Sequence, residues 1–248
     1  MGARTDNVTD PVLAASLLLM RRGQALWARK LNELRDEEFD EPSLLPGWTR
    51  RHLIAHVGFN ARANARLVEW ARTGIETPMY ESDTQRADEI AFGATLPTEA
   101  LRNLCAHAAV HLNVEWRDLA EDSWSNEVRT AQGRLVPVSE TVWMRTREVW
   151  IHAVDLRNGA SVDDFPAQLI DLLLDDLVRV WRRKRGEGAP DITLVPADRQ
   201  ETYSILGTGD GMVVQGSAVD LVGWGIGRRA RGVLTVDGDV PPPAPGWL

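Results

Sequence analysis

The stretch Glu148-Val-Trp-Ile-His152 places a carboxylate and an imidazole four residues apart in an aromatic-rich segment. Residues at that spacing project from one face of a helix, one turn apart. Far upstream, His52-Leu-Ile-Ala-His56 repeats the spacing with two imidazoles. Two histidines and a glutamate with one open position form a known catalytic zinc arrangement. The two pairs therefore predict a metal site inside a bundle of helices.

The composition is that of an ordinary globular protein without a basic face. At 248 residues, the chain suits one large domain or two small ones. A formal net charge of −8 argues against broad binding to nucleic acid. The one cysteine, Cys105, allows no internal disulfide, and the first ten residues lack a signal-peptide pattern. No apolar run approaches the roughly 20 residues that cross a bilayer, so we expect a cytoplasmic protein with no membrane partner.

The first 158 residues show helical periodicity in four long stretches. Thr9-Asp-Pro, Thr49 and Ser139 are placed to cap three of these helices, and Gly74 is placed to end the second. Ala131-Gln-Gly-Arg134 predicts a turn between two short extended pieces. The helices are expected over residues 9–38, 49–73, 98–121 and 139–156. This pattern fits a four-helix bundle, which we assign to a metal-binding domain over residues 1–158.

The pattern changes after Asn158, and residues 159–248 predict a small α+β domain. An amphipathic helix is expected over residues 165–185, with Pro166 at its start and a run of basic residues at its end. Four short β-like runs follow, and a helix is expected over residues 217–226 between the third and the fourth. These runs are Ile192–Val195, Thr202–Ile205, Met212–Gln215 and Val233–Val236. The extended, proline-rich tail ends in Trp247-Leu248, which we expect to dock back on the surface.

The residues alone leave more than one ligand set open. Spacing cannot choose between His52 and His56, and it does not exclude His107 and His111, which also lie four apart. The alternative for each histidine is an ordinary hydrogen-bonded residue in the core or on the surface.

Glu148 lies among apolar neighbours, where an unpaired carboxylate is costly to bury. A metal ion would remove that cost, and a salt bridge to Arg145 or Arg147 would remove it too. Asp155 is open between accepting a histidine N–H and capping the end of its helix.

Several motifs in combination resemble a known family. Leu45-Pro-Gly-Trp-Thr-Arg50, followed by His52-Leu-Ile-Ala-His56 and then Asn60, is similar to the first metal-bearing helix of the mycothiol-dependent maleylpyruvate isomerases. These belong to the larger DinB-like family of metal-binding helical bundles. The stretch Glu140–Leu156 is similar to their second metal helix. The resemblance covers essentially the whole chain, because it includes Glu76-Thr-Pro-Met-Tyr80, Thr130-Ala-Gln-Gly-Arg134 and the C-terminal Trp-Leu.

The resemblance implies a zinc ion held by His56, Glu148 and His152, with a fourth position for water or a thiolate. The third helix supplies no ligands in this family, which leaves His107 and His111 in structural or surface roles.

The resemblance also implies an active-site arginine from the C-terminal domain. Arg228 is the matching residue, and its neighbours Arg229 and Arg231 leave the register open by a residue or so. A guanidinium at this position would pair with a carboxylate of the substrate. Asn60, one turn beyond His56, is the candidate for contact with the thiol.

The implied reaction is the mycothiol-dependent cis–trans isomerisation of maleylpyruvate to fumarylpyruvate. Rotation about a C=C bond requires loss of its π character, which a thiolate provides by adding to one alkene carbon and leaving again. A zinc-coordinated thiol is deprotonated outright. Cys105 is expected to be a small buried residue, so the thiol comes from outside. The partners are then a small dicarboxylate substrate and a low-molecular-weight thiol.

Two other functions remain open from the sequence. One is a mycothiol S-transferase that acts on another electrophile with the same zinc–thiolate chemistry. The other is a non-catalytic metal-binding regulatory module, such as an anti-sigma-type helical protein. No heptad seam stands out, so we expect a monomer.

Overall fold

The structure, a computed structural model, describes residues 5–186, 191–207 and 211–247. The chain divides between Ala160 and Ser161 into two units, called here the N-terminal unit and the C-terminal unit.

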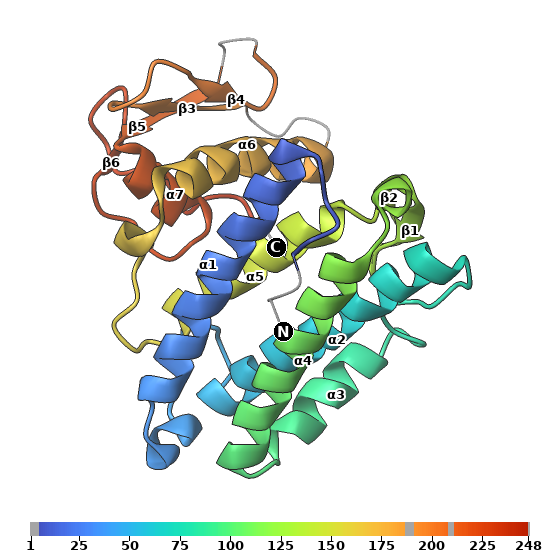
Figure 1. Ribbon diagram of the computed structural model, residues 1–248. Helices are drawn as coiled ribbons and strands as arrows, with labels where there is room; N and C mark the ends of the chain where they lie inside the picture. Colours follow the sequence, from blue (N-terminus) through green and yellow to red (C-terminus); the bar gives the residue numbers. More distant parts are fainter. Residues whose placement is uncertain (1–4, 187–190, 208–210, 248) are drawn as a thin grey trace. The chain divides into compact units, whose positions relative to one another are not determined.

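The N-terminal unit is built from helices that pack along their lengths (Figure 1). Helix α2 packs against α3, α4 and α5, and α1 packs against α5 and α4. The four expected long helices are present, although the first ends at Glu33 instead of residue 38 because the backbone is extended at Leu34. The expected turn at Gly133 joins strands β1 and β2. The elements are α1 (Pro11–Glu33), η1 (Asp36–Asp40), α2 (Arg50–Thr73), α3 (Gln85–Ala94), α4 (Thr98–Asp118), η2 (Glu121–Ser125), β1 (Glu127–Arg129), β2 (Leu135–Pro137) and α5 (Glu140–Asp155).

Helix α3 was not predicted from the sequence. It has ten residues, of which only Ile90 and Gly93 are buried. So short and polar a segment gives little helical periodicity, and its packing against α2 defines the helix instead.

The helix ends confirm two of the expected caps and correct two others. The Asp10 carboxylate accepts a hydrogen bond from the Val12 backbone N–H at 2.8 Å, and Gly74 ends α2 in the left-handed conformation with φ of 73°. Thr49 and Ser139 occupy the N-cap positions of α2 and α5, but neither side chain caps its helix. The Thr49 hydroxyl instead bonds the ring of His52 at 2.8 Å.

A glycine allows α1 and α5 to approach closely beside the predicted ligands. An ideal Cβ on Gly23 would lie 2.5 Å from the indole of Trp150, so any larger residue would push the two helices apart. The Trp150 indole N–H also donates to the Leu19 carbonyl at 3.1 Å. These contacts fix the turn of α5 between Glu148 and His152 against α1.

The C-terminal unit carries the predicted helices and strands. Its sheet has the strand order β4-β3-β5-β6, in which β3 and β5 are parallel and the other pairs antiparallel. The elements are η3 (Val162–Asp164), α6 (Ala167–Lys184), β3 (Ile192–Pro196), β4 (Tyr203–Ser204), β5 (Met212–Gly216), α7 (Ala218–Gly225) and β6 (Val233–Thr235).

The proline-rich tail docks on this unit as expected. The indole N–H groups of Trp224 and Trp181 donate to the carbonyls of Pro242 and Pro245 at 3.0 and 2.9 Å. Trp247 is buried and donates to the Asp176 carboxylate at 3.2 Å. Leu248, the other residue of the expected contact, lies outside the described residues.

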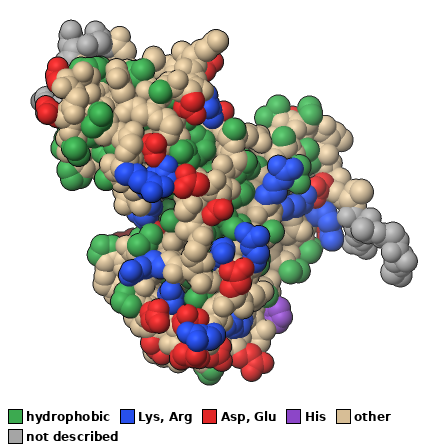
Figure 2. All heavy atoms as spheres, turned by 90° about the vertical axis from the view of Figure 1, so that its left-hand side faces the viewer, with side chains coloured by type: hydrophobic (Ala, Val, Ile, Leu, Met, Phe, Trp, Pro, Cys, Tyr) green, Lys and Arg blue, Asp and Glu red, His purple; other side chains and the backbone are tan. Residues whose placement is uncertain are grey.

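The surface around the end of α1 mixes both signs of charge. Figure 2 shows acidic and basic side chains interspersed over the lower part of this face. Ion pairs join Lys30 to Glu33 at 2.9 Å and Arg35 to Glu38 at 3.3 Å. Of the helices in the described parts of the chain, none combines the length and the apolar character that a membrane span requires.

Candidate metal centre

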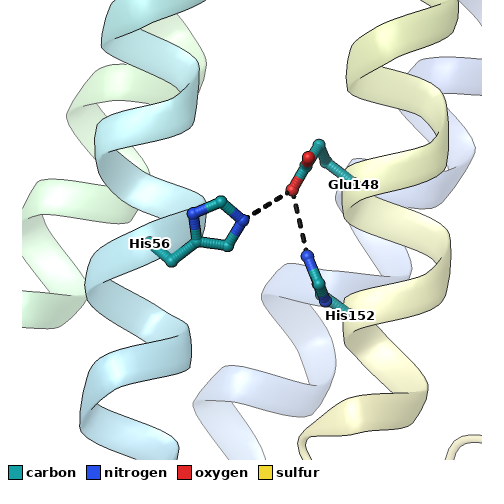
Figure 3. A group of neighbouring side chains, drawn as sticks. All are labelled: His56, Glu148 and His152. Atoms are coloured by element: carbon teal, nitrogen blue, oxygen red, sulfur yellow. Dashed lines mark hydrogen bonds and ion pairs between the residues drawn. The ribbon is translucent and has the colours of Figure 1, made fainter. Parts of the chain in front are cut away.

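Three of the predicted residues converge between α2 and α5 (Figure 3). His56 projects from α2, and Glu148 and His152 project from α5 one turn apart. The Nε2 atoms of His56 and His152 lie 3.0 and 3.1 Å from the same carboxylate oxygen, Oε2 of Glu148. All three ligand atoms lie within 4.8 Å of one another. The convergence joins residues 92 positions apart in the sequence.

The donor set and its spacing fit a zinc ion. Metal–ligand bonds of about 2.0–2.1 Å at tetrahedral angles place neighbouring ligand atoms roughly 3.3 Å apart. The observed distances of 3.0 and 3.1 Å from the carboxylate to the two imidazoles are close to that value. Two nitrogens and one oxygen also suit zinc, and they leave a fourth position for an exchangeable ligand.

Burial and mutual charge set the protonation of the three groups. Burial lowers the pKa of His56, although Glu148 opposes the shift. Burial also acts against the charge on His152, but the Glu148 carboxylate and the hydrogen bond to Asp155 outweigh it and raise the pKa of His152 to about 9. Burial alone would raise the pKa of Glu148, yet the two imidazoles hold it well below its ordinary value. The Glu148 carboxylate is therefore ionised at neutral pH, and the neighbouring His152 is protonated.

Asp155 orients the ring of His152. Its Oδ2 accepts a hydrogen bond from Nδ1 of His152 at 2.8 Å, and the aspartate side chain is fully buried. Such a bond to Nδ1 directs Nε2 toward a metal and makes the imidazole a stronger ligand. Of the two roles that the sequence left open for Asp155, the structure shows the histidine acceptor.

A buried arginine fixes the end of α5 that carries this pair. The Arg50 guanidinium donates to the carbonyls of Leu156 and Arg157 at 2.6 and 3.0 Å, and it pairs with Glu41 at 2.8 Å. The Leu44 N–H also donates to the Asp155 carbonyl at 2.9 Å. Arg50 at the start of α2 and Leu44 in the preceding loop thus hold the end of α5 in place.

The competing histidines do not join the cluster. His52 bonds Thr49 through Nδ1 and stacks on Trp48 at a centroid distance of 6.5 Å. The His56 ring instead meets His152 edge-on at 5.1 Å. His107 and His111 are exposed on α4, and His111 lies 3.5 Å from Glu115. Among the described residues, the group of acidic and histidine side chains spaced for a metal is His56, Glu148 and His152.

The salt bridge from Glu148 to Arg145, considered above as an alternative to a metal, does not form. Arg145 is fully buried, and its guanidinium donates to the Val57 carbonyl at 2.8 Å, to Oδ1 of Asn60 at 3.0 Å and to Gln24 at 3.0 Å. Burial lowers the pKa of Arg145 to about 10, although the Glu148 charge opposes the shift, so the guanidinium remains charged at neutral pH. In the described part of the chain, the ion-pair partners of Glu148 are the two histidines.

Asn60 lies one turn beyond His56 and is held by this arginine. Its amide oxygen accepts from Arg145 and from the Asn64 amide at 3.1 Å. Because two donors use the oxygen, the orientation of the amide is fixed, and its NH₂ group is the part that remains to donate.

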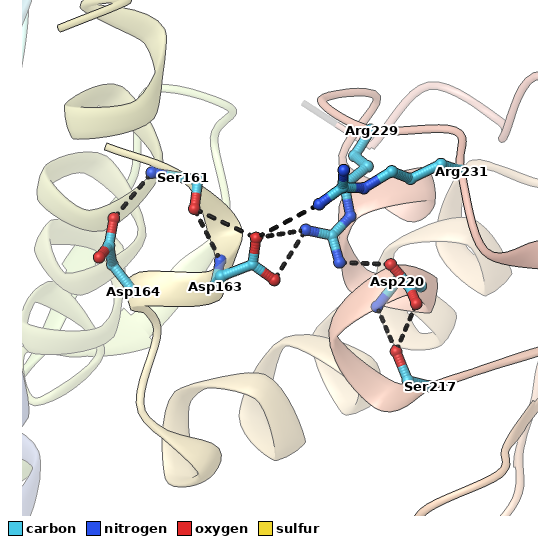
Figure 4. Close-up of polar contacts among 7 residues, drawn as sticks. All are labelled: Ser161, Asp163, Asp164, Ser217, Asp220, Arg229 and Arg231. Atoms are coloured by element: carbon cyan, nitrogen blue, oxygen red, sulfur yellow. Dashed lines mark hydrogen bonds and ion pairs between the residues drawn. The ribbon is translucent and has the colours of Figure 1, made fainter. Parts of the chain in front are cut away.

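In the C-terminal unit, two of the three candidate arginines, Arg229 and Arg231, lie beside Asp163 (Figure 4). Arg229 pairs with Asp163 at 2.7 Å and with Asp220, so its guanidinium ties α7 to η3. Arg231 is largely exposed and lies 3.7 Å from Asp163. The Arg228 side chain donates to the Ile226 carbonyl at 2.9 Å. The Arg229 guanidinium is therefore committed to Asp163 and Asp220.

Cys105 is buried as expected. Its thiol donates to the Ile54 carbonyl at 3.3 Å, and burial raises the pKa of the thiol to about 12. A thiol with such a pKa is not a nucleophile at neutral pH.

Sequence reasoning missed the polar residues that support the ligands. Arg50 and Arg145 act through contacts to segments 85 to 107 residues away, which no local spacing reveals. One sequence feature could have indicated the role of Arg145: it lies among apolar residues on the helix that carries Glu148.

Comparison with known proteins identifies the relatives of this chain. Residues 20–157 match the family model of the mycothiol maleylpyruvate isomerase N-terminal domain. A crystal structure of the mycothiol-dependent maleylpyruvate isomerase superimposes with a TM-score of 0.88 at 45% identity, covering 95% of this chain and 97% of the other. A structure of a histidine-to-alanine mutant of that enzyme has a TM-score of 0.87, with the same identity and coverage. A search of curated proteins gave no match.

Proposed function

This chain belongs to the mycothiol-dependent maleylpyruvate isomerase family, and we propose that it catalyses the cis–trans isomerisation of maleylpyruvate to fumarylpyruvate with mycothiol as the thiol. The observation that carries the proposal is the convergence of His56, Glu148 and His152, in a chain 45% identical over 95% of its length to that enzyme. We infer that α1, α2, α4 and α5 form the four-helix bundle of a metal-binding domain, and that the C-terminal unit supplies the substrate arginine.

His56, Glu148 and His152 would hold a zinc ion in this site. When bound, the ion would keep an added thiol deprotonated at neutral pH. The Asp155 carboxylate fixes the ring of His152, and Arg50 fixes the helix end on which both residues lie. Around a bound ion, the protein would hold two neutral imidazoles and one ionised carboxylate, and His152, whose pKa is about 9 in the free site, would release its proton.

The reaction needs one bond to be made and broken. Mycothiol would supply a thiolate sulfur that forms a C–S bond to an alkene carbon and breaks it again. While that bond exists, the former double bond could rotate, with its π electrons held as an enolate on the neighbouring ketone. The sequence is redox-neutral, and it returns the thiolate.

Arg228 is proposed to bind a substrate carboxylate and to stabilise the enolate charge, as a guanidinium can. The commitment of Arg229 to Asp163 and Asp220 argues against Arg229 in this role. Asn60 is proposed to donate from its fixed amide NH₂ group to the thiol. A cytoplasmic monomer remains the expectation from the sequence, and size-exclusion chromatography tests the oligomeric state.

The testing experiment measures zinc per chain and the rate of maleylpyruvate isomerisation with and without mycothiol. About one zinc per chain with strictly thiol-dependent turnover is the expected result. Zinc without isomerisation would contradict the proposal and point to transfer of the thiol to another electrophile. Absence of both metal and activity would refute the ligand assignment as well.

A further inference from the structure

The loop before α2 presents an aromatic ring to one of the predicted metal ligands. The Trp48 indole meets the ring of His56 edge-on at a centroid distance of 5.5 Å, and it stacks on the ring of His52 at 6.5 Å. His56 is buried, whereas Trp48 and His52 are partly exposed. These two rings thus border the metal centre on a side that solvent reaches, and the reaction described above gives them no role.

Backbone hydrogen bonds hold Trp48 in this place. Its N–H closes a turn on the Leu45 carbonyl at 3.1 Å. Pro46 and Gly47 form the centre of that turn, and Gly47 has a positive φ of 79°, which favours glycine. The Trp48 carbonyl accepts from both the N–H and the hydroxyl of Ser43 at 2.9 Å. Because the backbone is fixed in advance, a ligand that binds the ring has little loop freedom to remove.

The ring of His52 is held by a hydroxyl that would ordinarily cap the helix. Thr49 occupies the N-cap position of α2, yet its Oγ1 bonds Nδ1 of His52 at 2.8 Å and does not cap the helix. Departures from a local rule of this kind are expected at functional sites more than elsewhere. Since Nδ1 is used by Thr49, Nε2 is the nitrogen of His52 that can meet a ligand.

Each ring keeps a polar atom for a ligand. Within residues 5–186, 191–207 and 211–247, neither the indole N–H of Trp48 nor Nε2 of His52 has a hydrogen-bond partner. The indole N–H is a donor, and an imidazole nitrogen is a donor or an acceptor according to its tautomer. An apolar ring with a free donor is typical of surfaces that bind a partner with both apolar and polar groups.

The two arginines that follow Trp48 are both engaged elsewhere. Arg50 pairs with Glu41 at 2.8 Å and bonds carbonyls at the end of α5, and Arg51 pairs with Asp40 at 2.6 Å. A dicarboxylate calls for guanidinium groups that are not already paired. Hydroxyl groups instead both donate and accept, and the C–H groups of a sugar pack on aromatic rings. This side of the site therefore favours a hydroxyl-rich, uncharged group over the carboxylates of the substrate.

We propose that Trp48 and His52 form a subsite that binds the glucosamine–inositol portion of mycothiol. This inference rests on the proposed function, because it takes mycothiol as the thiol at the metal centre. Mycothiol joins its cysteine to an uncharged sugar and inositol, so groups at the border of the site are needed to hold that portion. The indole packs against C–H groups of the sugar, while the indole N–H and Nε2 of His52 bond its hydroxyls.

The test compares Trp48→Leu, Trp48→Phe and His52→Ala with Trp70→Leu. Calorimetric titration of each zinc-loaded protein gives the Kd for mycothiol and for N-acetylcysteine amide, a thiol that lacks the sugar and the inositol. Steady-state kinetics give the KM for maleylpyruvate. Trp70 is the matched control, because it is a partly exposed tryptophan on α2 that lies roughly 21 Å from His56 along the helix, at 1.5 Å per residue.

We expect Trp48→Leu to raise the Kd for mycothiol roughly tenfold, which is typical for loss of an aromatic packing contact. His52→Ala should raise it a few-fold, as loss of a neutral hydrogen bond does. Trp48→Phe keeps an aromatic ring and loses the N–H, so its Kd should lie between those of wild type and Trp48→Leu. The Kd for N-acetylcysteine amide and the KM for maleylpyruvate should stay within about twofold in all variants, because neither molecule contains the sugar.

Equal Kd values for mycothiol in Trp48→Leu and Trp70→Leu would overturn the subsite. So would an equal loss of affinity for mycothiol and N-acetylcysteine amide, or a rise in the KM for maleylpyruvate alone, which would make the substrate the occupant. Zinc content and thermal melting check that each variant is folded and loaded, and His52→Ala decides the same comparison if Trp48→Leu does not fold. Wild-type protein that binds mycothiol more tightly than N-acetylcysteine amide, but lacks isomerase activity, would instead refute the proposed function and leave the subsite standing.

Discussion

Replacing Asp155 with asparagine removes a charge and almost no volume from the support of His152. The aspartate side chain is fully buried and accepts from Nδ1 of His152 at 2.8 Å. An asparagine can still offer an amide oxygen at the same place, but without the charge that strengthens the bond. The substitution therefore tests how much the carboxylate contributes to metal binding, rather than whether the helix end can pack.

The expected effect follows from two opposing contributions. Loss of a carboxylate partner behind a histidine ligand typically weakens metal binding by about 10–100-fold, or roughly 1.4–2.7 kcal/mol. The same carboxylate also raises the pKa of His152, which is about 9. Below that pH the imidazole must release a proton when metal binds, so the wild-type affinity falls about tenfold for each pH unit. Asp155→Asn lowers this pKa, which reduces the proton competition. The difference between wild type and variant should be largest near pH 9 and smaller at pH 7.

Competition with a chromophoric zinc chelator, at pH 7 and at pH 9, measures both affinities. Asp176→Asn is the matched control, because Asp176 is equally buried in α6 and bonds Trp247 and Arg179 rather than a histidine. The control should lose stability and keep the wild-type zinc affinity. An Asp155→Asn protein that binds zinc as tightly as wild type, or whose deficit is the same at both pH values, would refute the reasoning.

Three further substitutions test other parts of the site. His56→Ala should abolish zinc binding, measured by elemental analysis. His52→Ala should retain it, because His52 bonds Thr49 instead of the cluster. Equal zinc contents in the two variants would contradict the choice of His56 as the ligand. Cys105→Ala should keep mycothiol-dependent turnover and lose on the order of 1 kcal/mol of unfolding free energy, measured in urea. Loss of turnover in a folded variant would show that the buried thiol takes part in the reaction. Arg50→Met should cost roughly 3 kcal/mol in the same assay, because carbonyls at the end of α5 lose their buried donor; a cost below 1 kcal/mol would show that water replaces it.

The long helices could be predicted because local sequence signals specify each of them. Helical periodicity, Asp10 before Pro11 and Gly74 after Thr73 mark the start of α1 and the end of α2 without tertiary information. The hydroxyl of Thr49 could not be assigned that way, because the side chain of His52 competes with the backbone for it. Helix α3 escaped prediction for a similar reason, since its packing on α2 defines it more than its sequence does.

The sequence alone predicted only part of the candidate site. The spacing of Glu148 and His152 is local, and the resemblance to a family then chose His56 over His52. Spacing could not make that choice, because it depends on which turn of α2 faces α5. It also could not place Asp155 behind His152, or show that Arg145 pairs with Asn60 instead of Glu148. These contacts depend on how the side chains pack in the folded structure.

The charges at the metal centre are balanced, although the whole protein has a formal net charge of −8. The carboxylates of Glu148 and Asp155 are matched by His152, whose pKa is about 9, and by the buried Arg145, whose described hydrogen-bond partners are neutral. Exchange of the His152 proton for a divalent ion would leave the site with a net positive charge. A thiolate and a dicarboxylate bring the negative charges that such a site can accommodate. An acidic protein can thus bind anions, because buried charges act at short range in a medium of low dielectric constant, while surface charges are screened by salt.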